Sequence, residues 1–408
     1  MDLLANTVRP YAWGSTTAIP ELLGTEPTGE PQAELWMGAH PGAPSRIDRG
    51  GGETALSQVI EADPEGELGA ATVRAFGPRL PFLLKVLAAA SPLSLQVHPD
   101  LAQAGEGFAD EEERGVPIDA PHRNYKDANH KPELICALTP FTGLCGFRRP
   151  AETAALLEAL DVDALKPYAD ILRARPEDEA LSEVLTAVLS ADRQAVAETV
   201  AAAAGAARRL GAGGGPGAEA YAAYAGIADH YPGDPGVLAA MLLNVVRLEP
   251  GEALYLGAGV PHAYLEGLGV EIMANSDNVL RCGLTPKHVD VPELLRVVRF
   301  EPTAPQVLRP EAAPGGEEVY AAPVEEFRLS RYVLTPDDAS RTLDGGAPQI
   351  LLCTDGEITL RETGHTEGRS ADDGGGLTLA RGRSAFVRAS DRVTVSGGGT
   401  LFRATVAV

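Results

Sequence analysis

The sequence is poor in cysteine and in positive charge, and each shortage excludes a class of protein. Its 4 cysteines form no CxxC pair, so we expect buried thiols in a reducing cytoplasm and neither a disulfide framework nor an all-cysteine metal site. The formal net charge of -23 argues against a nucleic-acid partner, because phosphate backbones need a basic face. It also weakens any interpretation as a membrane-surface protein.

Long apolar runs are missing as well. The most apolar stretch, residues 80–97, is interrupted by Lys85 and Pro92 and is too short for a membrane span. Residues 1–15 lack a cationic segment followed by an apolar run, so we expect no signal peptide and a cytoplasmic protein. An anionic small substrate is still compatible with this acidic chain, provided that lysines and arginines gather in one place.

The 408 residues are too many for one ordinary core. Residues 1–149 are rich in glycine and proline, residues 150–246 have a helical pattern, and residues 247–310 and 311–408 are β-like. This order predicts a mainly β fold with an α-helical insertion. We expect a first β unit formed by 1–149 and 247–310, a helical domain of 150–246 inserted into it, and a second β unit of 311–408. Such an insertion is tolerated where the ends of a surface loop lie close together.

Several local patterns predict particular elements. Apolar residues from 181 to 189 recur at the spacing of an amphipathic helix. The alanine-rich residues 195–210 favour a second helix, which the following glycine run ends. A further helix is expected over residues 237–245. Residues 349–362 predict two strands around an Asp-Gly turn.

The stretch SLQVHPD, residues 94–100, places an amide and an imidazole in an apolar strand. Gln96 and His98 lie two residues apart, with Val97 between them. Alternate side chains of a strand point to the same face, so Gln96 and His98 point together. A solvated sheet edge explains this pattern, and so does a metal site.

A second segment, PGEALYLGAGVPHAYLEG (residues 250–267), resembles the second sequence motif of the cupins, in which a histidine faces the interior of a β barrel. His262 occupies that position here, while Gly257 replaces the usual proline and Glu266 the usual asparagine. A β-hairpin with a surface histidine is the simpler alternative. Many cupins also carry an HxH motif with a nearby glutamate; this chain has QxH, and Glu133 precedes an apolar run that predicts a strand.

Six blocks together resemble the type I mannose-6-phosphate isomerases, and they occur in the order of that family. They are YAWGS (11–15), AELWMGAHP (33–41), SLQVHPD (94–100), YKDANHKPEL (125–134), VPHAYLEG (260–267) and EIMANSDNVLRCGLTPKHVDV (271–291). The last part of the chain resembles this family only in its general β-like pattern and not in a sequence block. The resemblance implies two cupin-like jelly-roll units, of which we expect the C-terminal one to bind no metal, because its only histidine, His365, lies in a Gly/Asp-rich loop.

The resemblance also implies one zinc ion per chain, held by four residues: Gln96, His98, Glu133 and His262. Zinc accepts imidazole nitrogen and carboxylate oxygen. A neutral amide ligand leaves the ion more positive than a second carboxylate would, which favours polarisation of a substrate oxygen. The two histidines and the glutamate would also suit non-haem iron; Gln96 is the residue that favours zinc.

Lysines and arginines near these blocks supply the local positive charge that a sugar phosphate requires. Arg281 and Lys287 lie close together in the chain, and Lys85, Lys126 and Lys131 are further candidates. A solvated surface position is the alternative for each lysine. The remaining candidates for substrate contacts are Trp13, Ser94, Tyr264 and Asp277; a core position is an equally good interpretation of Trp13.

The implied reaction interconverts mannose 6-phosphate and fructose 6-phosphate, by moving a proton between C2 and C1 through an enediol. Charge develops on oxygen as the proton leaves, so a nearby cation lowers the barrier. The resemblance assigns a catalytic role to Arg281, which is a poor base because it stays protonated. Glu271 or Lys131 is expected to carry the proton, and the sequence does not decide between them.

Two other functions fit parts of the pattern. An iron-dependent cupin oxygenase would use His98, Glu133 and His262 but would leave the cation cluster unexplained. A non-catalytic sugar-phosphate-binding protein would keep the fold without turnover.

For the isomerase, the resemblance implies a small-molecule sugar phosphate partner, a place in carbohydrate metabolism towards GDP-mannose, and a monomer or weak homo-oligomer. The other histidines are interpreted as structural or surface groups: His40, His122, His130, His230, His288 and His365.

Overall fold

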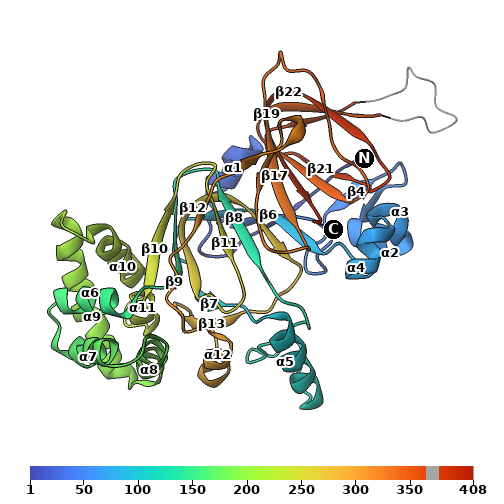
Figure 1. The fold of residues 1–408 in the computed structure, drawn as a ribbon. Helices are drawn as coiled ribbons and strands as arrows, with labels where there is room; N and C mark the ends of the chain where they lie inside the picture. The colour runs from blue at the N-terminus through green and yellow to red at the C-terminus, as the bar shows by residue number, and fades with distance from the viewer. Residues whose placement is uncertain (364–375, 408) are drawn as a thin grey trace.

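A computed structural model describes residues 1–363 and 376–407 (Figure 1). Two β units lie next to each other, and a helical block projects from the far side of the first one. His365, expected in a Gly/Asp-rich loop, lies outside the described residues. The expectation of a mainly β fold with an α-helical insertion is confirmed.

The first sheet has the strand order β14-β11-β8-β12-β6-β3-β2, and β7, β9, β10 and β13 branch from it through β12 and its neighbours. Its strands are β2 (Thr7–Arg9), β3 (Glu34–Met37), β6 (Phe82–Ala89), β7 (Leu95–Val97), β8 (Glu133–Ala137), β9 (Phe141–Phe147), β10 (Leu243–Leu248), β11 (Ala253–Leu256), β12 (His262–Ala274), β13 (Leu280–Gly283) and β14 (Val307–Leu308).

Strand β12 joins the two layers of this unit. Its first part pairs with β7 and β9, and its second part pairs with β6 and β8. The change of partner falls at Gly267, whose φ of 128° suits only glycine and whose Cβ would lie 2.9 Å from the Cα of Phe141. As a result, one strand brings His262 and Glu271 to the same interior from two layers.

The helical block is inserted between β9 and β10, which are adjacent antiparallel strands with Phe147 opposite Leu243. It contains α6 (Pro150–Ala159), η1 (Asp163–Leu165), α7 (Lys166–Ala174), α8 (Glu177–Ser190), α9 (Arg193–Ala212), α10 (Ala218–His230) and α11 (Gly236–Ala240). The helices expected over 181–189 and 195–210 are confirmed. The helix expected over 237–245 is wrong beyond Ala240, because residues 243–248 pair with β9 as β10.

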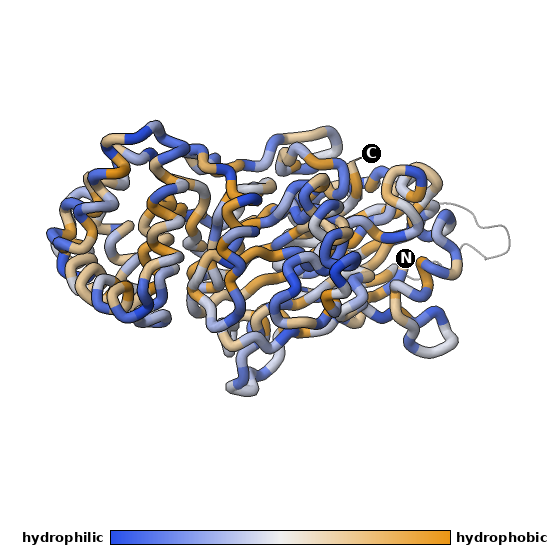
Figure 2. The backbone as a smooth tube through the Cα atoms, turned by 90° about the horizontal axis from the view of Figure 1, so that it is seen from below, coloured by the Kyte–Doolittle hydropathy of each residue, from blue (hydrophilic) through white to orange (hydrophobic). Residues whose placement is uncertain are grey.

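Short elements cover the β units. They are α1 (Ala18–Leu23), β4 (Arg46–Asp48), β5 (Glu53–Ala55), α2 (Leu56–Ala62), α3 (Pro64–Leu68), α4 (Ala70–Phe76), α5 (Leu101–Glu113) and α12 (Val291–Val297). Runs of hydrophobic residues follow the central strands, whereas hydrophobic and hydrophilic residues alternate along the helices (Figure 2). In the described residues, no helix is both long enough and apolar enough to span a membrane.

The C-terminal sheet has the order β1-β21-β19-β22-β17-β16-β15, with β18 on β22 and β20 on β19. Its strands are β1 (Asp2–Leu3), β15 (Glu311–Ala312), β16 (Glu318–Tyr320), β17 (Arg328–Leu334), β18 (Arg341–Thr342), β19 (Gln349–Glu362), β20 (Leu377–Ala380), β21 (Ser384–Val387) and β22 (Val393–Thr405); η2 (Pro314–Gly316) lies between β15 and β16.

Two expectations about this sheet need correction. Residues 349–362 form one strand and not two, because β19 pairs with the long β22 from Ile350 to Glu362; the register shifts at Thr354, and Asp355 and Gly356 stay paired, opposite Thr400 and Gly399. In addition, Asp2 pairs with Phe386, so the start of the chain joins the second sheet, whereas the proposed first unit included it. The two units share an apolar core, in which Leu84 and Ile272 pack with Phe402.

The C-terminal unit also contains a buried ion pair. Arg403 Nη1 lies 3.0 Å from Glu317 Oε1, and both side chains are 5% exposed. The guanidinium also donates to Gln349 Oε1 at 2.7 Å and to the carbonyl of Asp344 at 2.9 Å. Because Arg403, Glu317 and Gln349 are all buried, removing one member of the ion pair leaves a charge without compensation.

We predict that Arg403→Ala destabilises the C-terminal unit by about 3 kcal/mol, the cost of an unpaired buried charge. Denaturant unfolding of the full chain measures this change. Arg309→Ala is the control, since the Arg309 side chain is 81% exposed in its pair with Glu252 and its loss is expected to cost less than about 1 kcal/mol. Equal effects of the two variants would contradict the prediction.

Candidate metal centre and substrate pocket

Three buried side chains from three strands converge inside the first β unit. His98 follows β7, Glu133 opens β8 and His262 opens β12. Their potential ligand atoms all lie within 4.8 Å of one another. His98 Nε2 is 3.4 Å from Glu133 Oε1, and His262 Nε2 is 3.5 Å from Glu133 Oε2. The cluster therefore has the residue types and the compactness of a metal site.

Backbone carbonyls fix the orientation of both imidazoles. His98 Nδ1 is 2.8 Å from the carbonyl oxygen of Asn278, and His262 Nδ1 is 2.9 Å from that of Val260. A carbonyl only accepts, so each Nδ1 donates, and in the neutral form of each ring Nε2 carries the lone pair on the side that faces Glu133.

Two atoms of the cluster have no hydrogen-bond partner within the described residues. They are His98 Nε2 and Glu133 Oε2. Burying such lone pairs side by side is costly unless a cation receives them. The residues present therefore fit a bound metal ion.

The charge states of the cluster also suit a metal ion. Burial, together with the charge of Lys131, lowers the pKa of His98 to about 4. Although burial raises the pKa of Glu133, the charge of Lys131 holds it well below its ordinary value. Neutral imidazole and ionised carboxylate are the forms that bind metal, so no proton has to leave these two groups at neutral pH.

Gln96 lies against this cluster. Its backbone pairs with that of His262, and its amide Nε2 is 3.4 Å from His262 Nε2. A half-turn of the amide would present Oε1 in place of Nε2. The residue is placed to add a fourth ligand, and that role remains a prediction.

A cavity of about 610 Å³ opens next to the cluster. It is lined by eleven of the fourteen side chains singled out from the sequence, and the two fully buried histidines lie immediately behind Glu133. The lining candidates are Trp13, Lys85, Ser94, Gln96, Lys131, Glu133, Tyr264, Glu271, Asp277, Arg281 and Lys287. The structure thus brings the predicted site residues together around one space.

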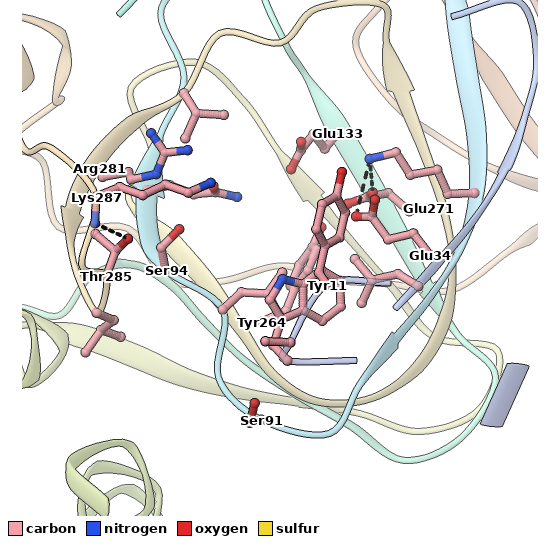
Figure 3. Close-up of a pocket in the computed structure, with 18 of the residues that line it drawn as sticks. Tyr11, Glu34, Ser91, Ser94, Glu133, Tyr264, Glu271, Arg281, Thr285 and Lys287 are labelled. Atoms are coloured by element: carbon pink, nitrogen blue, oxygen red, sulfur yellow. Dashed lines mark hydrogen bonds and ion pairs between the residues drawn. The ribbon is translucent and has the colours of Figure 1, made fainter. Parts of the chain in front are cut away.

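One side of the cavity carries positive charge without neutralisation. Arg281 and Lys287 lie side by side there, near Ser94 and Thr285 (Figure 3). Among the described residues neither cation has an ion-pair partner within 4 Å. Burial lowers the pKa of Arg281, and burial together with the charge of Arg281 lowers that of Lys287. Both shifts reflect the cost of two uncompensated cations, which an anionic ligand would relieve.

The opposite side of the cavity carries carboxylates that form ion pairs with two lysines. Lys85 Nζ lies 3.2 Å from Glu271 Oε2 and 3.6 Å from Glu34 Oε1 (Figure 3). Lys131 Nζ lies 3.0 Å from Glu133 Oε1. The expectation that Lys85 and Lys131 join the free cation cluster therefore fails, because neighbouring carboxylates neutralise both. Lys126 does not line the cavity, and its ammonium donates to the carbonyl of Ile118.

Several predicted contacts occupy the walls. Trp13 is half-buried and stacks on Tyr11, with ring centroids 5.7 Å apart. Burial raises the pKa of Tyr264 well above its ordinary value, so its phenol stays protonated. Its oxygen has no hydrogen-bond partner in the described part of the chain. Ser94 precedes β7, so it lines the cavity from a loop. Asp277 Oδ1 is 3.4 Å from His40 Nε2.

The sequence reasoning missed some lining residues. Glu34 and Trp36 face the cavity together from β3, and Trp36 Nε1 donates to Glu34 at 2.7 Å. Their spacing of two in the AELWMGAHP block was the available signal. His230, interpreted as structural or surface, also lines the cavity, as does Tyr231 at the end of α10. His130 is half-buried and pairs with Glu326 of the C-terminal unit.

Comparison with known proteins gives a consistent result. Residues 1–150 match the family model described as phosphomannose isomerase type I, catalytic domain. The chain is 43% identical to the mannose-6-phosphate isomerase of Escherichia coli K12 over 99% of each chain. It is 32% identical to that of Homo sapiens, over 96% of this chain and 94% of the human one.

Solved structures of phosphomannose isomerases share the whole fold. A mutant of the enzyme from Salmonella typhimurium superposes with a TM-score of 0.90 at 40% identity and covers 100% of both chains. A zinc-bound holo structure of mannose 6-phosphate isomerase superposes with a TM-score of 0.88 at 40% identity, over 100% of this chain and 99% of that one.

Asn278 ties the parts of the metal cluster together. Its carbonyl orients His98, and its side chain donates to the carbonyls of Asp127 (2.7 Å) and Asn129 (2.8 Å). The side-chain oxygen accepts from the backbone amide of Lys126 at 2.7 Å. These bonds join the segment after β12 to the loop that leads into Glu133.

We predict that Asn278→Ala destabilises the protein by about 2–3 kcal/mol, since several buried partners lose their bonds, and weakens metal retention by about tenfold or more. Thermal unfolding and metal titration against a chelator measure the two effects. Asn6→Ala is the control, because Asn6 bonds Ser45 and Ser384 away from the cavity. It should lower stability without changing metal retention; a similar loss of metal in both variants would contradict the assignment.

Proposed function

The chain belongs to the type I mannose-6-phosphate isomerase family, and on that premise we propose that it interconverts mannose 6-phosphate and fructose 6-phosphate with one bound zinc ion. The observation that carries the proposal is the cavity itself. One side presents His98, Glu133 and His262 as a buried set of potential metal ligands, and the other side presents Arg281 and Lys287, which have no ion-pair partner among the described residues. A phosphorylated sugar supplies oxygen atoms to the metal side and a phosphate to the cation side.

Gln96, His98, Glu133 and His262 would hold the zinc ion, which when bound would supply a positive charge that polarises a substrate oxygen. An iron oxygenase would use the same two histidines and the glutamate. That alternative leaves the cations opposite the cluster without a purpose, and zinc is the metal bound in the similar holo structure. A non-catalytic binding protein would need the cations but not the buried carboxylates beside the sugar.

The phosphate binds between Lys287 and Arg281, near Ser94. Arg281 is the inner member of this pair, because its backbone lies opposite that of Gln96. Its guanidinium is therefore the cation that also steadies negative charge on an enediolate oxygen. The phenol of Tyr264 donates to a sugar hydroxyl from the neighbouring wall, which gives its buried oxygen a partner.

Glu271 carries the proton between C2 and C1. Burial raises the pKa of this carboxyl, the charge of Lys85 opposes the rise, and Glu133 and Glu34 add to it. A carboxylate with a raised pKa takes up and returns a proton more readily than an ordinary one. Lys131, which contacts Glu133 at 3.0 Å, is assigned to the metal side, where its charge helps to stabilise the enediolate.

We predict that the protein turns over mannose 6-phosphate in a coupled isomerase assay, and that chelation removes this activity reversibly. Turnover should fall to background after a strong chelator and return when zinc is added in stoichiometric amount, because the buried ligands bind a cation in place. A folded, zinc-loaded protein with no turnover would overturn the substrate assignment.

We predict that Glu271→Gln lowers kcat by about 10²–10⁴-fold, the usual contribution of a general base. The wild-type rate should fall as pH drops through the raised pKa of Glu271, because the carboxylate is the active form and it becomes protonated. The pH–rate profile of the wild type therefore has an acid limb above the ordinary pKa of 4.5.

Glu266→Gln is the matched control, because Glu266 is an exposed carboxylate on the same strand. It should keep both kcat and the acid limb. Near-full turnover by zinc-loaded Glu271→Gln would show that Glu271 does not carry the proton and would move that role to Lys131.

A further inference from the structure

The loop that carries Lys287 is attached to the helical block on the side that faces away from the substrate cavity. Residues 284–287 follow β13 and line the substrate cavity. Asp234, in the segment between α10 and α11, accepts hydrogen bonds from the backbone of this loop. Asp234 Oδ1 accepts from the amide of Leu284 at 3.0 Å, and Oδ2 accepts from that of Thr285 at 3.3 Å. Oδ1 also accepts from Gly236 at 2.7 Å, which fixes the carboxylate to its own element.

A backbone contact reinforces this attachment. A Cβ on Gly236 would lie 2.5 Å from the amide nitrogen of Leu284, so the first turn of α11 touches the loop directly. Gly283 has a φ of 132° and Leu284 a φ of 55°. Leucine rarely adopts the left-handed region, and it stays there only where the surroundings hold it. Asp234 bonds the amide of this strained residue.

Residues 285–287 have little other support on the side that faces α8 and α9. A second cavity of about 600 Å³ separates them from α8 and from the start of α9. Thr285, Pro286 and Lys287 form the wall between this cavity and the substrate cavity. Leu284 is buried in the core of the helical block, and next to it the bonds of Asp234 and the Gly236 contact hold the backbone that leads to Lys287.

We propose that Asp234 is a positioning residue for phosphate binding, through which the inserted helical block sets the affinity of the Arg281–Lys287 cation pair. The proposal rests on the proposed function for the identity of the bound group. It assigns the helical block a part in substrate affinity, while the proton transfer and the metal cluster lie on other elements.

The test compares Asp234→Asn and Asp234→Ala with the wild-type holoenzyme. KM for mannose 6-phosphate, kcat and the inhibition constant of inorganic phosphate are measured for each, together with zinc content. We expect KM and the phosphate inhibition constant to rise in parallel, by about threefold for asparagine and about tenfold for alanine, as one or all of the loop bonds are lost. The value of kcat should stay within about twofold and zinc content should not change.

Gly236→Ala tests the same attachment without changing charge. Its methyl group would push against Leu284, so the phosphate inhibition constant should rise here too, although alanine favours the helix. Gly226→Ala in α10 is the matched control, because a Cβ at Gly226 meets no atom within 4 Å. Asp229→Asn controls for charge, since Asp229 lies on the same block and pairs only with Arg208 at the surface. Both controls should leave KM and phosphate inhibition unchanged.

An inhibition constant is independent of the fraction of active enzyme, so general destabilisation does not raise it. If Asp234→Ala and Gly236→Ala left the phosphate constant within twofold of the wild type, the proposal would be overturned. The same holds if kcat and zinc content fell while that constant stayed unchanged. If the wild type did not turn over the sugar phosphate, the proposed function would fail separately, and calorimetric titration with inorganic phosphate would still decide the role of Asp234. Should Asp234→Ala not fold, Asp234→Asn and Gly236→Ala carry the comparison.

Discussion

The structure depends on the cost of burying polar ligand atoms together without hydrogen-bond partners. His98, Glu133 and His262 direct lone pairs into one small space, and two of those atoms lack any partner in the described residues. A bound metal ion would satisfy these atoms and stabilise the cluster. The surrounding fold is built to keep it: β7, β8 and β12 each deliver one ligand, carbonyls fix both imidazoles, and Gly267 lets β12 pass between layers.

The cavity beside the cluster separates two kinds of positive charge. Lys85 and Lys131 are neutralised by carboxylates, whereas Arg281 and Lys287 are not. This difference explains how a chain with a net charge of -23 provides a site for a phosphate. The electrostatic potential in the cavity depends on whether the nearby charges are neutralised and not on the net charge of the whole chain. The inserted helical block contributes to the same cavity, through His230 and Tyr231 in its wall and through Asp234 behind it.

Much of this could be predicted from the sequence, because short-range patterns carry it. The spacing of Gln96 and His98 in a strand, the glycine-turn-histidine segment and the helical periodicity of residues 181–189 all depend on neighbours in the chain. What could not be predicted depends on distant partners. Nothing in the sequence distinguishes Lys85 from Lys287 as a candidate cation for the phosphate. Only the fold shows that Glu34 and Glu271 lie beside Lys85. Residues 243–245 and 349–362 were assigned wrongly for the same reason, because β9 and β22 decide their structure.

The most direct test of the account is diffraction from crystals of the zinc-loaded protein, recorded above and below the zinc absorption edge. The account predicts one anomalous peak per chain, about 2.0–2.2 Å from nitrogen or oxygen atoms of His98, Glu133, His262 and Gln96. A zinc-loaded crystal with its peak elsewhere, or with none between these residues, would contradict the claim that the cluster is the metal site around which the cavity is organised.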